Sequence, residues 1–236
     1  MKKLILLIIG VLFLGTISTQ AQLKKNTPSR VSHDKGFTFG LGLKGGLTFT
    51  SLTGSLDGGD FYDKSGTGFE IGAFVNSRFG KRNPNLKNSL SGTGVFGLKV
   101  EALYKQIAAK TIGDDNLKMG YFEVPVLAQV YPFYKSKNIN NIYIEAGPVI
   151  AGTMGSNPDV ITVDGVRSYA VGDLKGFDVR IAFGAGWTES NTGIGINVRY
   201  NIGTSKLAKN FPLKTNILEF ALTYRLPYIG IGNNIK

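Results

Sequence analysis

Two stretches, FDVRIAFGAGW (residues 177–187) and IGINVRYNI (residues 194–202), decide the fold. In both, nearly every second residue is large and apolar, and the residues between are charged, amide or small. A period of two places alternate side chains on opposite faces of a β-strand. The polar residues between the two stretches predict a turn, so the pattern is that of two strands joined by a short connection.

The same alternation recurs along the chain from Gly36 on, with Gly, Asn, Asp, Ser and Lys clusters between the alternating segments. It predicts eight strands, at residues 37–50, 67–79, 94–107, 117–131, 142–153, 176–188, 193–203 and 216–227. Beyond the N-terminus the sequence has no stretch of about 18 apolar residues, so a membrane location requires a closed barrel, in which every strand edge is paired. The predicted fold class is all-β: an eight-stranded antiparallel up-and-down transmembrane β-barrel.

The polar face of these strands carries a balanced set of charges. A soluble barrel turns its apolar face inward, whereas a membrane barrel turns it toward lipid. Gly and Ala accompany the charges, which suits a crowded interior, and equal numbers of cations and anions suit an interior with little water, because unpaired buried charge is costly. We predict a lumen charge network of Lys44, Glu70, Arg78, Lys99, Glu101, Glu123, Glu145, Asp178, Arg180, Arg199, Glu219 and Arg225. The alternative is a soluble sheet whose charges face water.

Aromatic residues gather toward the strand ends, where membrane barrels carry two girdles at headgroup level. The residues in question are Phe37, Phe49, Phe69, Phe79, Tyr121, Tyr131, Phe133, Phe177, Trp187, Tyr200, Tyr224 and Tyr228.

The lengths of the connections predict an orientation. With the N-terminus in the periplasm, the outward connections have about 16, 9, 22 and 12 residues and the inward ones about 14, 10 and 4. The longest, residues 154–175, is where we expect partner contacts, because exposed loops carry most recognition. Its candidate contact residues are Asp159, Asp164, Arg167, Tyr169 and Asp173.

The first residues have the pattern of a secretory signal: Lys2 and Lys3, an apolar run from Leu4 to Leu14, and small residues ending at Ala21, the expected cleavage site. We therefore divide the chain into a signal peptide (1–21), a periplasmic tether (22–35), the barrel (36–228) and a C-terminal extension (229–236). The alternative for the first segment is an uncleaved anchor.

Composition excludes several kinds of chemistry. The chain has no Cys, which excludes disulfides and thiolate metal sites, and its single histidine, His33, lies in the tether. A histidine-based triad or metal site is therefore disfavoured, and we expect neither an enzyme nor a cofactor. The net charge of +11 becomes +9 without Lys2 and Lys3, and export makes lipid phosphates a simpler counterpart for it than nucleic acid. GLGLKG (40–45) spells a dinucleotide motif, but it lies inside a strand pattern with no helix after it.

Two segments, YFEVPVL (121–127) and IEAGPV (144–149), contain motifs that recur in a known family. The first is similar to the Y-x-E-I-P-L-L strand, and the second to the G-P strand, of the PorT-like outer-membrane β-barrel family of Bacteroidetes, which the chain resembles. Asp178 with FGAG (183–186), RYNIG (199–203) and GLKGG (42–46) follow three further motifs, although Thr48 stands where the family has Asn. The chain also departs from the usual terminal aromatic, because residues 229–236 follow Tyr228. The resemblance implies a barrel in the outer membrane of a Gram-negative cell.

On these grounds we expect a monomeric outer-membrane barrel with a filled lumen, acting as a structural or loop-mediated interaction protein with a secretion- or envelope-associated role. Its expected partners are outer-membrane lipids, lipopolysaccharide and an envelope protein bound by the outer loops. The alternatives are a narrow pore or transport accessory, an exported soluble lipocalin-like barrel, and a lipid-modifying barrel enzyme. Pro125 and Pro148 each remove a backbone donor, and we expect bulges or bends there.

Overall fold

The computed structural model describes residues 37–56, 59–62, 64–80, 94–110, 116–136, 138–157, 160–163, 167–170, 176–205, 214–226 and 229–231. The described residues all belong to one compact unit of the chain, residues 33–236. Within these ranges, no helix is long and apolar enough to cross a membrane. The predicted signal peptide with Ala21, and the tether, lie outside the described residues.

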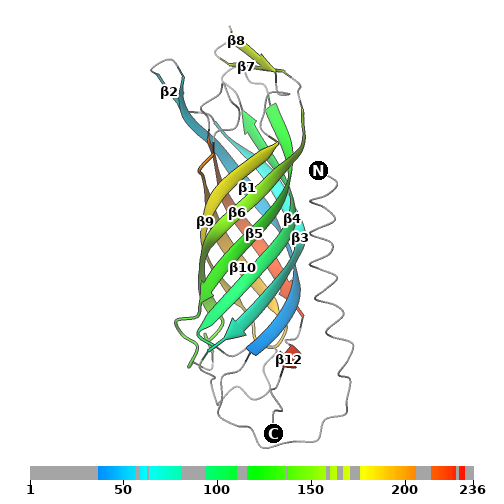
Figure 1. Ribbon diagram of the computed structural model, residues 1–236, viewed down its shortest axis with the longest axis vertical. Helices are drawn as coiled ribbons and strands as arrows, with labels where there is room; N and C mark the ends of the chain where they lie inside the picture. The colour runs from blue at the N-terminus through cyan, green and yellow to red at the C-terminus, as the bar shows by residue number, and fades with distance from the viewer. Residues whose placement is uncertain are drawn as a thin grey trace, which may run out of the picture. The chain divides into compact units, whose positions relative to one another are not determined.

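Eight long strands form the barrel wall, and they run steeply inclined around it (Figure 1). They are β1 (Phe37–Leu56), β3 (Lys64–Phe79), β4 (Phe96–Lys110), β5 (Asn116–Val130), β6 (Ile142–Asn157), β9 (Phe177–Thr188), β10 (Ile194–Gly203) and β11 (Lys214–Arg225). Each pairs antiparallel with its neighbour in the chain, and β1 closes the barrel by pairing with β11 from Gly42↔Arg225 to Thr53↔Lys214. The predicted fold class is therefore confirmed.

Four short strands complete the structure. β2 (Gly59–Tyr62) pairs with the last residues of β1, and β12 (Ile229–Ile231) pairs with its first residues. β7 (Val160–Val163) and β8 (Arg167–Ala170) form a separate hairpin in the connection between β6 and β9. This hairpin lies at the same end of the barrel as β2 (Figure 1), which we call the loop end; the turns that follow β5, at 131–136, and β9, at 189–193, define the opposite, turn end.

Alternation in the sequence becomes alternation in burial. In β10 every second residue, from Gly195 to Gly203, is buried, and the residues between are exposed. β9 and β11 follow the same rule along most of their lengths. The exposed set is almost entirely aliphatic and aromatic, with Leu43, Ile71 and Leu222 among its most exposed members. The barrel is thus apolar outside and polar inside, the inverse of a soluble protein.

The β9–β10 connection, one of the turns, shows why that hairpin forms. Gly193 has a φ of +77°, which residues with a side chain rarely adopt, and a Cβ there would collide with the backbone of Arg225. One carboxylate oxygen of Glu189, Oε2, accepts hydrogen bonds from the backbone N–H groups of Asn191 (2.7 Å) and Thr192 (2.5 Å). These bonds hold the pKa of Glu189 below its ordinary value, the one to the Thr192 backbone contributing most.

Both prolines fit the wall without a change of register. The β5–β6 pairing has the same register at Pro125↔Val149 and Ala128↔Ala146, on either side of Pro148. A register shift does occur in this pair, between Gly120 and Tyr121. The bulges expected at Pro125 and Pro148 are therefore not found at these residues. Instead, the backbone pairing between neighbouring strands is interrupted around each proline and resumes in the same register.

Candidate functional site in the barrel lumen

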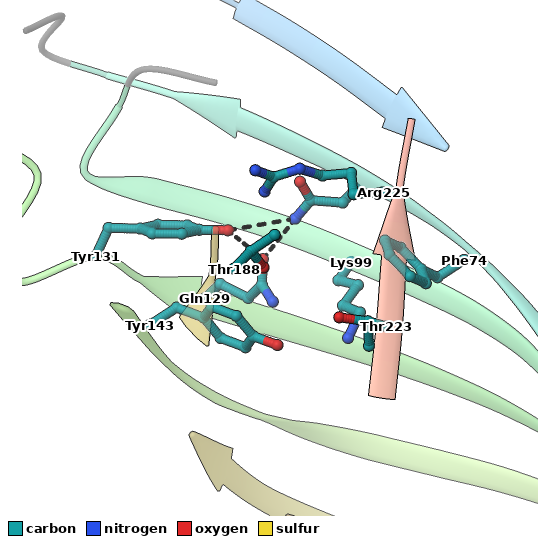
Figure 2. Close-up of a pocket in the computed structure, with 9 residues that line it drawn as sticks. Phe74, Lys99, Gln129, Tyr131, Tyr143, Thr188, Thr223 and Arg225 are labelled. Carbon is teal, nitrogen blue, oxygen red and sulfur yellow. Dashed lines mark hydrogen bonds between the residues drawn. The ribbon is translucent and has the colours of Figure 1, made fainter. Parts of the chain in front are cut away.

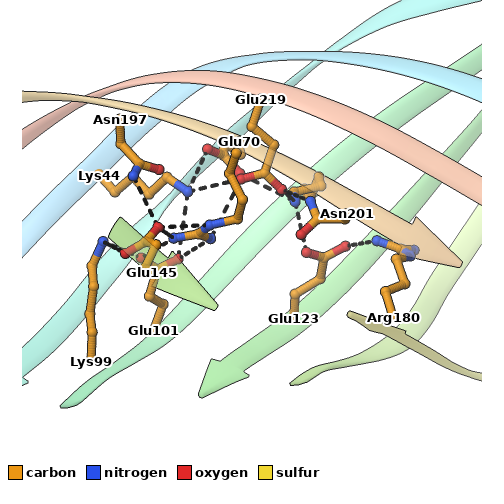
Figure 3. Close-up of polar contacts among 12 residues, drawn as sticks. Lys44, Glu70, Lys99, Glu101, Glu123, Glu145, Arg180, Asn197, Asn201 and Glu219 are labelled. Atoms are coloured by element: carbon orange, nitrogen blue, oxygen red, sulfur yellow. Dashed lines mark hydrogen bonds and ion pairs between the residues drawn. The ribbon is translucent and has the colours of Figure 1, made fainter. Parts of the chain in front are cut away.

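All twelve residues of the predicted charge network are buried inside the barrel. Each of the eight wall strands contributes at least one of them. Because side chains alternate between the two faces of a strand, a charged residue at an inward position points into the lumen. Ion pairs then cross the lumen between strands that are not neighbours in the sheet (Figure 3).

Arg199 on β10 is the most connected of these residues. Its guanidinium donates to the Glu101 carboxylate of β4 through Nη1 and Nη2, both at 2.8 Å, and to Glu145 Oε1 of β6 at 2.7 Å through Nη2. Glu219 on the neighbouring β11 lies 3.5 Å from Nη1. A planar fork with five N–H groups suits such a position, because it satisfies several carboxylates from one point.

Two lysines extend the network around the wall. Lys44 on β1 lies 2.9 Å from Glu70, 3.0 Å from Glu219 and 3.5 Å from Glu101. Lys105 on β4 lies 2.8 Å from Glu123 and 3.3 Å from Glu70, and it also bonds Glu219. Each lysine therefore has three carboxylates around one ammonium group, which compensates for its removal from water.

Toward the loop end the network finishes in a smaller cluster. Arg180 bonds Glu123 of β5 and lies 2.7 Å from Asp178 on its own strand. The Asp178 carboxylate also accepts a hydrogen bond from Ser205, where β10 gives way to its connection. Tyr121 lies beneath the Arg180 guanidinium, 5.0 Å from ring centroid to Cζ.

Toward the turn end, amides and aromatic rings replace carboxylates. Gln129 donates to Glu145 at 2.9 Å and accepts from Asn76 at 2.6 Å and from the Tyr131 hydroxyl at 2.9 Å. The Tyr131 ring stacks under Arg78, 3.6 Å from the guanidinium carbon, and Arg78 in turn donates to Asn141 at 2.8 Å. Tyr121 and Tyr131 are thus lumen residues, and their predicted place in the outer girdles is wrong.

One cavity remains at this end (Figure 2). Its volume of about 10 Å³ corresponds to about one water molecule. The lining residues are Phe74, Asn76, Lys99, Gln129, Tyr131, Tyr143, Thr188, Thr223 and Arg225.

Sequence reasoning missed Lys105, which is fully buried. The signal was present, because Lys105 has the same parity along β4 as Lys99 and Glu101. With Lys105 included, the buried cations and anions are no longer equal in number, as the sequence had predicted them to be. Among the described residues, the buried charges are seven cations and six anions: Lys44, Arg78, Lys99, Lys105, Arg180, Arg199 and Arg225 against Glu70, Glu101, Glu123, Glu145, Asp178 and Glu219.

The candidate partner loop is described only in part. Arg167 and Tyr169 lie in β8, whereas Asp159, Asp164 and Asp173 lie outside the described residues. In the part of the chain that the structure describes, no group of three or more His, Cys, Asp or Glu side chains is arranged to hold a metal ion. The structure therefore has a plug of salt bridges in the interior of the barrel and a surface of loops at one end.

The comparison with protein families agrees with this architecture, because the outer membrane protein beta-barrel domain family matches residues 20–209. Ail, the attachment invasion locus protein of Yersinia pestis, is similar in two structures. The one in complex with the heparin analogue sucrose octasulfate is 14% identical, with a TM-score of 0.41, and the other is 15% identical, with a TM-score of 0.40; each match covers 81% of this chain and 99% of Ail. The outer membrane enzyme PagL is 14% identical over 76% of this chain and 99% of its own, with a TM-score of 0.36. Curated protein sequences give no match.

Proposed function

The chain belongs to the outer membrane protein beta-barrel domain family, and from this premise we propose that it is a closed, non-conducting barrel that presents its loop end to a partner. The chain is an outer-membrane β-barrel, so the soluble lipocalin-like alternative does not apply. The proposal has two parts: the lumen is a structural plug, and recognition belongs to the loops.

The ion-pair network is the single observation that carries the first part. Arg199, Lys44 and Lys105 tie side chains from opposite sides of the wall together in the middle of the lumen. An eight-stranded barrel has an interior just wide enough for side chains to fill. Moving a solute through it would require separating buried charges, at several kcal/mol for each. This favours a plug over the narrow pore.

The second part rests on the loop end. β1 is 20 residues long and β6 is 16, whereas about 9–11 residues span an outer membrane. At that end β1 continues into its pairing with β2, and the connection after β6 contains the β7–β8 hairpin with Arg167 and Tyr169. We infer that this end faces outward, with the N-terminus on the periplasmic side after removal of a signal peptide. Lipopolysaccharide or an envelope protein would bind there, and the barrel itself would be a monomer without enzymatic activity.

A closer relation to the PorT-like barrels of Bacteroidetes belongs to the same proposal. It rests on the motif YFEVPVL in β5, in which the inward-facing Glu123 is followed two residues later by Pro125. A secretion- or envelope-associated role would follow from that relation.

Two measurements on the full chain test the proposal. In planar bilayers the purified protein is expected to give no stable conductance steps, and a reproducible open state would overturn the plug. In detergent-solubilised outer membranes, cross-linking is expected to recover lipopolysaccharide or one envelope protein with the native chain but not with the double variant Arg167→Ala/Tyr169→Ala. The matched control is Tyr134→Ala/Lys135→Ala in the turn after β5, at the other end. Equal recovery from all three proteins would contradict the role of the loop end.

A further inference from the structure

The outer face of the barrel wall carries few charges. Among the wall side chains that the structure describes, only Lys118 on β5 and Lys214 on β11 are charged and lie outside the lumen. Both are exposed, and both stand at the loop end, where β5 and β11 begin. The edge of the apolar band is the level at which lipid headgroups surround a membrane barrel. The described charges of the outer face are therefore positive and confined to one headgroup layer.

Hydrogen-bond donors lie near Lys118. Gln106 on β4 is paired with Gly120, which is two residues from Lys118 on β5. Tyr104, also on β4, is paired with Phe122, but its hydroxyl extends toward the loop end, because a Cβ placed on Gly120 would lie 3.4 Å from it. An ammonium group, an amide and a phenolic hydroxyl thus lie on the same outward face of two neighbouring strands.

Lys118 and Gln106 have no partner within the described part of the chain. Neither the ammonium group nor the side-chain amide takes part in a hydrogen bond or an ion pair there. The acidic side chains that the structure describes lie in the lumen, apart from Glu189 at the turn end. Both donors are therefore available to an anion that approaches from outside the protein.

The pairing of β3 with β4 brings two more lysines to the same corner of the wall. Lys64 on β3 is directly opposite Lys110 on β4. Ala108 is paired with Lys118, so Lys110 is the next position on the same face of β4. Like charges at opposite positions destabilise a pair of strands. An anion bound at this corner would offset that repulsion, so the register favours an anionic ligand.

The surface next to these donors, toward the middle of the wall, is aromatic. The rings of Phe69 and Tyr104 lie 6.0 Å apart, and Phe122, the partner of Tyr104 on β5, is exposed. Aromatic rings of this kind suit the boundary between headgroups and acyl chains. The ligand that fits this surface therefore has an anionic part joined to an apolar one, which a lipid has and free phosphate lacks.

Lys214 has different surroundings. It is paired with Thr53 of β1. Asn216, the next outward residue of its strand, is already bonded on both sides of its amide. The nitrogen donates to Thr53 Oγ1 at 3.2 Å, and the oxygen accepts from the backbone N–H of Gly203 at 3.2 Å. Lys214 thus offers the same charge at the same end of the barrel without free donors beside it.

We propose that Tyr104, Gln106 and Lys118, together with Lys64 and Lys110, bind a phosphate group of lipid A, the lipid anchor of lipopolysaccharide. A phosphate accepts hydrogen bonds from ammonium, amide and hydroxyl groups, and those from ammonium groups are strengthened by charge. The acyl chains then lie along the aromatic surface. This site rests on the proposed function, because it requires the loop end to face outward. It also divides the loop end: the wall binds lipopolysaccharide, and the β7–β8 hairpin is left for an envelope protein.

Bisphosphorylated lipid A is the probe, added to the refolded full-length protein in maltoside micelles, and native mass spectrometry measures the bound fraction. Dephosphorylated lipid A is expected to bind more weakly by at least about tenfold, the effect of losing charge-assisted hydrogen bonds. Lys118→Gln should weaken binding roughly fivefold, and Lys64→Gln/Lys110→Gln/Lys118→Gln roughly a hundredfold, because each lysine near an anionic lipid contributes a similar amount. Gel mobility without heating confirms that each variant is folded.

The matched control is Lys214→Gln, which removes one exposed lysine at the same end and should bind lipid A as the native protein does. Equal binding of the two lipids would overturn the proposal, as would native affinity in the triple variant or equal losses in Lys118→Gln and Lys214→Gln. Full displacement of the lipid by millimolar inorganic phosphate would reveal a site for free phosphate and would overturn the lipid as its ligand.

The hairpin variant Arg167→Ala/Tyr169→Ala separates this proposal from the proposed function. It should keep the native affinity for lipid A. If it lost lipid A while the lysine variants kept it, lipopolysaccharide would belong to the hairpin, and the wall site would fail while the proposed function stood. If the lysine variants lost lipid A but cross-linking recovered no envelope protein through the hairpin, the wall site would stand and hairpin recognition would fail.

Discussion

The two faces of β10 have nearly opposite environments although their residues alternate along one strand. Val198 is 41% exposed and Arg199, the next residue, is 1% exposed. Val198 contacts the surroundings of the barrel, whereas Arg199 joins carboxylates from β4 and β6. In a soluble protein the aliphatic residue would be the buried one.

This difference shows which solvent the barrel was built for. Lipid provides the apolar environment that a core normally provides, so the outer face needs no cover. The lumen then has to satisfy its own polar groups, because little water reaches them. The outer face can therefore tolerate a change of shape but not of polarity, whereas the lumen can tolerate neither. Four substitutions test this contrast, and they are given in decreasing order of their predicted loss of stability.

Arg199→Leu should have the largest effect. It removes one of the two cations that Glu101 and Glu145 share, the other being Lys99, and breaking a buried ion pair from one side typically costs about 3–5 kcal/mol. Urea unfolding in lipid vesicles measures the loss. The matched control is Tyr200→Leu, one residue away on the lipid face, which should change the free energy of unfolding by under about 1 kcal/mol. Equal losses for the two variants would remove the distinction between the faces.

Val198→Arg should come next. A cation on the lipid face near the bilayer midplane costs about 2–4 kcal/mol. Val198→Leu at the same position should be nearly neutral, because it keeps an apolar surface toward lipid. If the arginine variant were as stable as the leucine variant, Val198 would face water and the inside-out arrangement would be wrong.

Gln129→Leu tests the amide layer at the turn end of the lumen. It removes the acceptor of Tyr131 and the donor to Glu145, and stranded buried polar groups cost about 1–3 kcal/mol. Ala128→Leu, the neighbouring outward position, serves as the control in the same unfolding assay. A gain in stability for Gln129→Leu would show that water already satisfies this layer.

Glu189→Gln should have the smallest effect, because this carboxylate lies at an exposed turn. The fold lowers its pKa, so its contribution is present at neutral pH and is lost as the pH falls through the pKa of the folded protein. The native protein should therefore be more stable than the variant at pH 7, and the two should converge in acid. A difference that grows as the pH falls would contradict the hydrogen bonds seen in the turn.

The wall strands could be predicted from the sequence because period two is a local property. The predicted segment 142–153 and the structure's β6 begin at the same residue, and the inward sets of β9, β10 and β11 follow directly from parity. Strand ends were harder. β1 extends to Leu56, past the predicted end at residue 50, because pairing with β2 stabilises residues whose own pattern is weak.

Other features depend on contacts that no local pattern encodes. β12, within the predicted C-terminal extension, is a strand only because β1 offers it a free edge. Tyr121 and Tyr131 had the same composition signal as girdle aromatics. Inward parity separates Tyr121 from its exposed neighbour Phe122, whereas Phe133 has the parity of Tyr131 and is exposed because it lies beyond the end of β5. The convergence of Arg199 on Glu101 and Glu145 depends on how the barrel closes, which parity alone does not give.

The direction in which the sheet faces can be measured by fluorescence from single cysteines. The native chain has no Cys, so Val198→Cys and Asn191→Cys each carry one thiol for a bimane label. In lipid vesicles, brominated acyl chains should quench the label at position 198 strongly and aqueous iodide should not, with the reverse at position 191 in the β9–β10 turn. Iodide quenching at position 198 as strong as at position 191 would contradict the account.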